Sequence, residues 1–134
     1  MTFRAMLDTN IMSTMMRQGA GRLWQRIERF GTGNICVSTI STAELRYGAD
    51  LRRSPRLHAE IDEILTVIRA LPFEAPADAI YGSIRTHLRL SGTPIGGNDL
   101  FIAAHALALD LTLVTANVGE FSRVPNLRIE NWLD

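Results

Sequence analysis

The sequence predicts an α/β fold in which helices cover both faces of a mainly parallel sheet. Short, continuously apolar segments alternate with longer segments whose apolar residues recur every three or four positions. Continuous apolar strands separated by helices are typical of parallel sheets that are buried on both faces. No linker, internal repeat or low-complexity stretch interrupts the chain. We therefore expect residues 1–134 to form a single domain with a sheet of four or five strands.

The first half of the chain predicts two buried strands and three of the helices. In order, these elements are a strand at residues 3–7, a helix from about 11 to the glycines at 19–21, a helix with apolar residues at 23, 24, 27 and 30, a turn at 31–33, a strand at 35–37 and a helix from about 39 to 52. Asp8, Thr9 and Asn10 supply capping side chains for the first helix, and Ser38 is the expected cap of the third.

The second half predicts three more helices and up to three strands. In order, these are a helix at residues 55–70, a short strand at 71–74, a helix from Pro76 to about 92, a loop at 93–97, a nearly all-apolar helix capped by Asn98 and ending at 109, a strand at 111–115, a loop at 116–121 and an edge strand within 127–132. Proline is favoured in the first turn of a helix, which explains the start at Pro76.

Composition narrows the possible functions without choosing one. The formal charge is zero, so no strong overall field attracts nucleic acid or a membrane. All 14 basic residues are arginine, so mechanisms that need a catalytic lysine are excluded. The single cysteine, Cys36, lies in an apolar run and is expected to be a buried free thiol. No apolar stretch is long enough to cross a bilayer, and we expect a cytoplasmic protein without a membrane partner.

Four acidic residues, Asp8, Glu44, Asp99 and Glu120, follow strand ends or lie in the segments after them. Each has an ordinary structural explanation when it is considered alone. Asp8 could be only a helix cap, and Glu44 could belong to a capping box that begins at Ser41. Asp99 gains about 0.3–1 kcal/mol from the dipole of a helix start, and Glu120 could be a solvated loop residue.

Glu44 is the hardest of the four to explain structurally. Ser38 as the cap places Glu44 in the second helical turn, where the apolar residues that predict the inward face are Ile40, Ala43, Tyr47 and Leu51. A carboxylate on such a face costs several kcal/mol unless it is paired, protonated or bound to metal.

Taken together, the four acids predict a cation site. Because the carboxyl ends of parallel strands meet at one edge of the sheet, these side chains should converge there, with Thr115 and Asn117 beside them. Clustered carboxylates repel one another unless a cation neutralises them, and oxygen ligands select Mg²⁺ or Mn²⁺. Such an ion activates water against a phosphodiester, which is nuclease chemistry.

Five segments are distinctive when taken together: MLDTNI at 6–11, STISTAELRYG at 38–48, NDLFIAAHA at 98–106, LVTANVGEF at 113–121 and VPNLRIENW at 124–132. In sequence and in order, they closely resemble the PIN-domain toxins of the VapC type. The resemblance spans essentially the whole chain. It implies a twisted parallel sheet flanked by helices and an endoribonuclease that depends on Mg²⁺, with Mn²⁺ as a possible substitute, and that acts on tRNA or ribosomal RNA.

The same resemblance implies partners and residue roles. A cognate antitoxin would cover the site, operator DNA would be contacted only through that antitoxin, and the toxin would form a homodimer. Asp8, Glu44 and Asp99 match the three main acidic residues of the family. Thr9 and Asn10 match the family's residues beside the first acid, and Thr115 matches its hydroxyl at the end of the fourth strand.

One departure from the family pattern lies in the loop after the expected strand at residues 111–115. Many family members have Asp where this chain has Asn117, so Glu120 is expected to supply the fourth carboxylate, with Asn117 positioning a water. We therefore expect one firmly bound metal ion. Asp8 and Asp99 would bind it directly, and Glu44 and Glu120 would act through water or orient the nucleophile.

Further interpretations stay open at this stage. Arginines from 46 to 56 would hold the RNA backbone, or would simply form a solvated helix face. An aspartyl-phosphate mechanism at Asp8 is disfavoured because Asn10 stands where a second Asp is usual and because the chain has no lysine. A fold retained only for binding protein or RNA is disfavoured by the presence of Asp8, Glu44 and Asp99.

Overall fold

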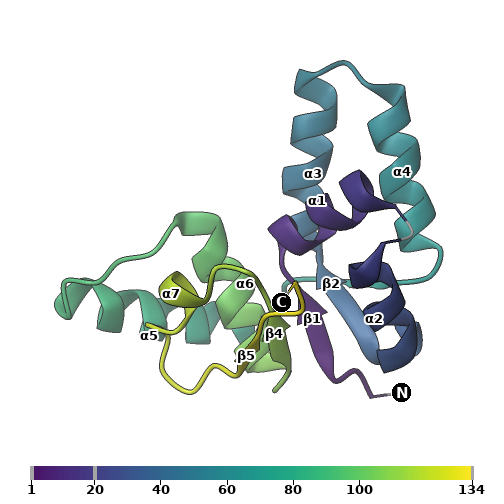
Figure 1. Cartoon of the computed structure of the whole chain (residues 1–134). Helices are drawn as coiled ribbons and strands as arrows, with labels where there is room; N and C mark the ends of the chain where they lie inside the picture. The colour runs from purple at the N-terminus through teal and green to yellow at the C-terminus, as the bar shows by residue number, and fades with distance from the viewer. Residues whose placement is uncertain (1, 20, 134) are drawn as a thin grey trace.

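The computed structural model describes residues 2–19 and 21–133, which contain a five-stranded sheet (Figure 1). The strands are β1 (Ala5–Leu7), β2 (Ile35–Ser38), β3 (Arg69–Leu71), β4 (Thr112–Val114) and β5 (Ile129–Glu130). They lie in the order β3-β2-β1-β4-β5, and every neighbouring pair is parallel. The predicted parallel sheet is confirmed, and the strand that precedes Asp8 lies at its centre.

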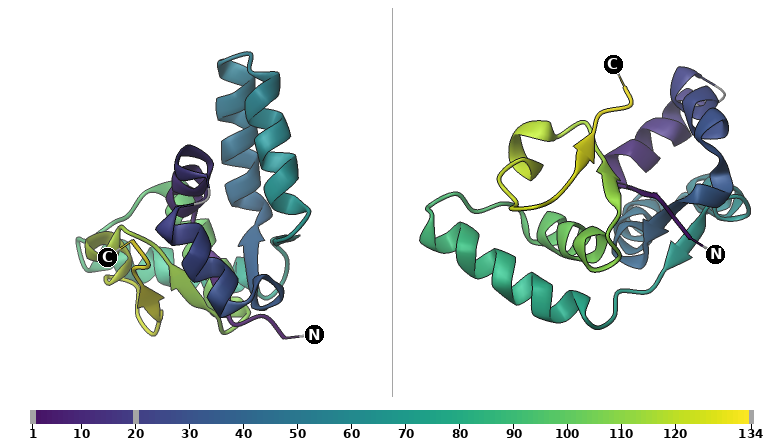
Figure 2. Two further views of the ribbon diagram at one scale, coloured as in Figure 1. Left: turned by 45° about the vertical axis from the view of Figure 1, so that its right-hand side comes forward. Right: turned by 90° about the horizontal axis from the view of Figure 1, so that it is seen from below.

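Helices connect these strands and form a layer on each face of the sheet. They are α1 (Thr9–Gln18), α2 (Arg22–Phe30), the 3₁₀ helix η1 (Thr32–Asn34), α3 (Thr39–Leu51), α4 (Pro55–Leu65), α5 (Ala77–Leu90), α6 (Gly97–Ala108) and α7 (Val118–Phe121). The view from below in Figure 2 shows α5 and α6 on one side of the strands and α1 and α2 on the other.

The strands alternate between two hydrophobic cores. Met6 of β1 and Cys36 of β2 face the core formed with α5 and α6. Ala5 and Leu7 face the core formed with α1 and α2, which Trp132 near the C-terminus completes. Because both faces are buried there, the central strand β1 and the first three residues of β2 are apolar throughout, which explains their continuous apolar runs in the sequence.

Helices α3 and α4 form a hairpin that stands away from the sheet, at an angle to the half that contains α5 to α7 (Figures 1 and 2). Only part of the hairpin therefore packs on a core. The predicted inward face of α3 is wrong at three of its four residues, since Ala43 is exposed and the exposed fractions of Tyr47 and Leu51 are 69% and 70%. The buried side chains of α3 are the small ones of Ser41 and Ala49.

Several predicted boundaries also shift. Helix α4 ends at Leu65, not Ala70, and the chain turns so that the buried Ile68 leads directly into β3. The cap of α6 is Gly96, so the prediction of Asn98 as its cap is wrong. The predicted loop after β4 contains the short helix α7, and Phe121 at its end is buried in the core.

The structure also bears on the expectations for Cys36 and for membrane-spanning segments. Cys36 is buried as a free thiol, and burial raises its pKa to about 12. Within residues 2–19 and 21–133, no helix has the length and hydropathy needed to cross a membrane.

Candidate active site

Asp8 lies directly after the central strand and begins helix α1. Its Oδ1 accepts a hydrogen bond from the backbone N–H of Ile11 at 2.8 Å, so Asp8 is the helix cap that its position predicts. The Asp8 side chain is almost fully buried. Burial raises its pKa, and the charge of Glu44 adds to the increase, while hydrogen bonds from Thr115 and from the backbone of Ile11 and Asn10 oppose it. The residue that caps α1 is therefore also a carboxylate whose ionisation burial makes less favourable.

Glu44 reaches the same region from α3. Ser38 caps this helix, as predicted, because its Oγ accepts a hydrogen bond from the N–H of Ile40 at 3.1 Å. Glu44 consequently lies in the second turn, half-buried, and its Oε1 accepts the hydroxyl proton of Thr9 at 2.7 Å. This contact joins the first residue of α1 to α3, so the segments after β1 and β2 meet through a carboxylate.

Asp99 and Glu120 form a second pair of carboxylates that contact each other. Asp99 lies in the first turn of α6 and Glu120 lies in α7. Oε1 of Glu120 accepts the N–H of Gly96 at 2.9 Å, and Oε2 accepts the side-chain amide of Asn117 at 2.5 Å. A Cβ placed on Gly96 would lie 3.8 Å from an oxygen of each acid, so the two carboxylates converge over this glycine.

The pKa values of Asp99 and Glu120 shift in opposite directions. Burial and the charge of Glu120 raise the pKa of Asp99 to about 7, and the charges of Asp8 and Glu44 add to the increase. Burial also acts to raise the pKa of Glu120, but the hydrogen bonds from Gly96 and Asn117 outweigh it, and the net shift is downward. Below about pH 7, Asp99 of the metal-free protein therefore keeps its proton and can donate a hydrogen bond to the ionised Glu120.

The predicted supporting residues contact this cluster in different ways. Thr115 hydrogen-bonds to Asp8, and its Oγ1 also accepts the N–H of Asn117 at 2.9 Å. Thr9 contacts Glu44, whereas Asn10 contributes its backbone N–H to Asp8 and exposes its side chain. Asn117 contacts Glu120 directly, a hydrogen bond that the sequence did not predict.

The four carboxylates fit a hard cation by their chemistry. Their ligand atoms are all oxygens, and the charges of the other three acids raise the pKa of Asp99. In residues 2–19 and 21–133, however, no three acidic, histidine or cysteine side chains stand close enough to enclose a metal ion. Side chains would have to move towards a bound ion.

Two contacts beside the site hold its helices in place. His105 of α6 is buried in the core, and its Nδ1 lies 2.8 Å from Oγ of Ser38. This contact links the helix of Asp99 to the cap of the helix of Glu44. The hydrogen bond from the N–H of Gly96 to Glu120 is the second contact, and its one signal in the sequence is the glycine pair before Asp99.

The site is a cluster of carboxylates at the carboxyl edge of a parallel sheet, and comparison with known proteins identifies the family of the chain. The PIN domain model matches residues 5–127. Ribonuclease VapC2 of Rickettsia felis is 39% identical over 95% of this chain and 96% of its own length. The tRNA(fMet)-specific endonuclease VapC of Salmonella typhimurium is 34% identical over 95% of this chain and 96% of its own length.

Solved structures support the same family assignment. The VapBC2 complex of Rickettsia felis bound to a promoter DNA fragment contains a chain with a TM-score of 0.89 and 37% identity, covering 97% of this chain and 99% of that one. The DNA-bound VapBC of Salmonella typhimurium gives 0.92 and 34%, covering 98% and 99%. The chain therefore belongs to the PIN-domain family and, within it, to the VapC ribonucleases of VapBC toxin–antitoxin systems.

Proposed function

We propose that this protein is a metal-dependent endoribonuclease and the toxin of a toxin–antitoxin pair. The observation that supports this most directly is the gathering of Asp8, Glu44, Asp99 and Glu120 where β1, β2 and β4 end. When bound, Mg²⁺ would supply a Lewis acid for the phosphodiester and lower the pKa of an attacking water. Mn²⁺ would serve as a substitute.

The residues of the chain would divide this work. Asp8 and Asp99 would hold the ion directly. Glu44, oriented by the hydroxyl of Thr9, and Glu120, held by Gly96 and Asn117, would orient the attacking water and accept its proton. Both oxygens of Glu120 already accept hydrogen bonds, which favours an indirect role for it and supports one firmly bound ion.

The direct test is RNA cleavage by the purified protein. Transfer RNA is the first substrate to try, because the Salmonella relative is named as an endonuclease specific for tRNA(fMet), and ribosomal RNA is the second. We expect cleavage with Mg²⁺ or Mn²⁺ and none with EDTA. Intact RNA from several tRNA pools and ribosomes, with both metals supplied, would contradict the proposal.

Variants separate the assigned site from a contaminating nuclease. Asp8→Asn and Asp99→Asn should each lower cleavage at least 100-fold, because each removes a charged metal ligand. Asp78→Asn is the matched control, since Asp78 is an exposed acid in the first turn of α5, outside the cluster. Full activity of Asp8→Asn would contradict the site.

The partner proposal follows from the relatives, whose solved structures are toxin–antitoxin complexes, some with promoter DNA. We expect the product of a neighbouring reading frame to bind this chain, to suppress RNA cleavage and to carry the contact with operator DNA. Co-purification followed by a cleavage assay tests this. Light scattering of the isolated chain tests the expected homodimer.

A further inference from the structure

A groove leaves the acidic cluster between α1 and the α3–α4 hairpin. Its volume is about 610 Å³. Its lining includes Thr9 and Arg17 from α1, Glu44 and Gly48 from α3, Arg52 from the turn and Arg56 from α4. Because Thr9 and Glu44 belong to the candidate active site, the groove opens onto that site.

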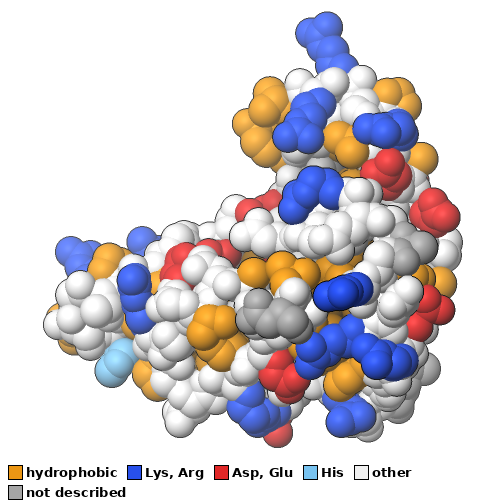
Figure 3. Space-filling model, viewed as in Figure 1, with side chains coloured by type: hydrophobic (Ala, Val, Ile, Leu, Met, Phe, Trp, Pro, Cys, Tyr) orange, Lys and Arg blue, Asp and Glu red, His pale blue; other side chains and the backbone are white. Residues whose placement is uncertain are grey.

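Three arginines, Arg17, Arg52 and Arg56, line this groove together with the acids Glu44 and Glu60. Arg56 has a side chain that is 82% exposed and only a 3.9 Å contact with Glu60. Arg52 is exposed at the end of α3, and Arg17 contacts the hydroxyl of Thr14 at 3.1 Å. Figure 3 shows basic side chains over the hairpin and acidic ones in the angle beside it.

Not every arginine of the hairpin is available in this way. Arg46 is hydrogen-bonded to Asp62 and to the backbone oxygen of His58, so its charge is already paired. The expectation that arginines from 46 to 56 act together is therefore too broad. The structure separates Arg52 and Arg56, which line the groove, from Arg46, which does not.

The lining of the groove also contains apolar side chains. Met16, Leu45 and Leu57 provide apolar surface there. Gly48 contributes no side chain, and a Cβ placed on it would meet nothing within 4 Å. The groove thus combines apolar surface with guanidinium groups, the combination that binds bases and backbone of single-stranded nucleic acid.

We propose that this groove holds a single-stranded segment of the RNA next to the bond that is cleaved, with Arg52 and Arg56 contacting its phosphates and Arg17 assisting from the opposite wall. This rests on the proposed function. A cluster of carboxylates repels a polyanion, and the chain has no net charge to overcome that repulsion. Arginines beside the acids supply the missing attraction and hold the RNA in register with the site.

The test compares RNA cleavage by the wild type, Arg52→Gln, Arg56→Gln and the double variant over a range of salt concentrations. The double variant should raise KM roughly tenfold at moderate salt and change kcat less than twofold. Each lost phosphate contact should reduce the slope of log affinity against log salt by about 0.7. RNA binding by fluorescence anisotropy gives the affinity independently of turnover.

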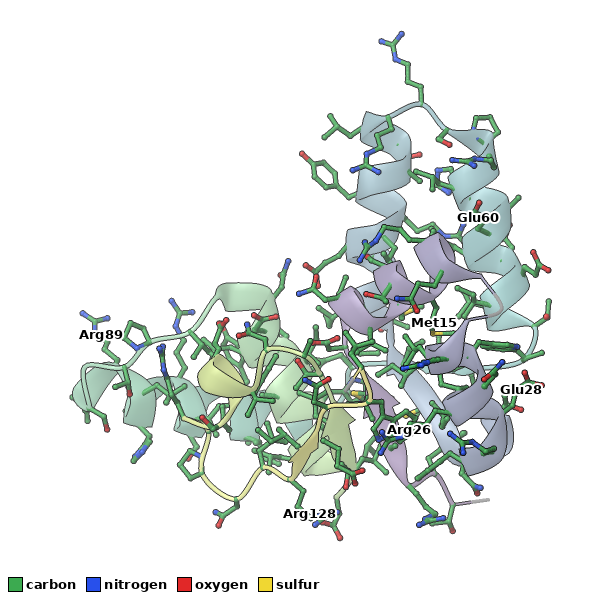
Figure 4. The ribbon with its side chains drawn as sticks, viewed as in Figure 1. Met15, Arg26, Glu28, Glu60, Arg89 and Arg128 are labelled. Atoms are coloured by element: carbon green, nitrogen blue, oxygen red, sulfur yellow. The ribbon has the colours of Figure 1, made fainter. Side chains whose placement is uncertain are left out.

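Two control variants match the charge change. Arg53→Gln alters the hairpin turn beside Arg52, outside the groove, and Arg89→Gln alters the distant end of α5 (Figure 4). Both should behave as the wild type. Gly48→Leu fills the groove without changing charge in a helix that tolerates leucine, and it should raise KM for RNA as well.

The possible outcomes separate the two proposals. Unchanged KM and salt slope in the double variant would overturn the groove proposal while leaving the nuclease intact. If the wild type cleaves no RNA, the proposed function fails, and the anisotropy measurement still decides whether the groove binds RNA. If RNA kinetics are unchanged but inhibition by the antitoxin is lost, the groove belongs to the protein partner and the proposal is wrong.

Discussion

The side-chain amide of Asn117 donates a hydrogen bond to Oε2 of Glu120, with 2.5 Å between the two heavy atoms. An aspartate at position 117 could not donate this hydrogen bond in its ionised form. Asn117 is thus more than a missing carboxylate, because it holds Glu120 in place opposite the N–H of Gly96. The pair therefore presents one negative charge at a place where two neighbouring acids would present two.

Asn117→Asp should destabilise the metal-free protein at pH 7.5, because it replaces the hydrogen bond with repulsion between two carboxylates. A hydrogen bond to a charged group contributes about 1.5–3 kcal/mol, and Glu120 is partly exposed, so we expect the lower end. Urea denaturation in EDTA measures the change. Asn117→Ala removes the hydrogen bond without adding charge, and equal stability of the two variants would show that repulsion is negligible.

Asp99 should make the metal-free protein less stable as pH rises. Its pKa is about 7 in the folded state against an ordinary value of 3.8, so its contribution to stability is full below 3.8 and is lost as pH rises through 7. Asp99→Asn lacks this loss. The difference in unfolding free energy between wild type and Asp99→Asn should therefore favour the variant increasingly from pH 5.5 to 8.

The same comparison has two internal checks. His105 has a lowered pKa and Asp8 a raised one, but both are present in wild type and variant, so their contributions largely cancel in the difference. Mg²⁺ at about 100 times its Kd should stabilise the wild type by about 2.7 kcal/mol and the variant much less. A difference that does not change with pH would contradict the raised pKa of Asp99.

Thr9→Val should lower kcat on RNA by roughly 10- to 100-fold with little change in KM. Valine has nearly the same shape as threonine but cannot donate the hydrogen bond that orients Oε1 of Glu44. The range corresponds to a hydrogen bond to a charged group. Steady-state cleavage assays measure the effect. Thr9→Ser keeps the hydroxyl and should restore most of the activity, and a serine variant as slow as the valine variant would point to packing instead.

Ser38→Ala should cost about 2 kcal/mol of unfolding free energy. Ser38 both caps α3 and hydrogen-bonds to buried His105. His105 is also hydrogen-bonded to the backbone of Pro72, and burial lowers its pKa, so the ring is neutral at pH 7.5. A double-mutant cycle with His105→Leu should give a coupling of about 0.5–1.5 kcal/mol in urea titrations. A coupling near zero would show that the two side chains contribute independently.

The edge of the sheet at which the acids gather could be predicted because parallel strands leave little choice. Once the strands before Asp8, Glu44 and Asn117 are recognised as parallel, their carboxyl ends must share one edge. The remaining acid, Asp99, comes from the start of a helix, and its place depends on α6 packing beside β4. The order of the strands was not predicted, because apolar runs do not say which strand pairs with which.

The errors have physical causes as well. Tyr47 and Leu51 were predicted to face inward from their spacing, but the hairpin leaves the sheet before either side chain reaches a core. Periodicity gives the apolar face of a helix, not what covers it. The contacts of Glu120 with Gly96 and Asn117 could not be predicted, since a backbone donor and a turn amide have no distinctive sequence pattern.

The pairing of β1 with β4 has a consequence for how this protein is made. The backbone N–H of Asp8 donates to the oxygen of Val114, so Asp8 is held by a strand that is synthesised after Glu44 and Asp99. A nascent chain released before β4 would contain Asp8, Glu44 and Asp99 without the strand that holds Asp8 in place. Chains truncated before β4 should therefore show no RNA cleavage, although they would contain these three acids.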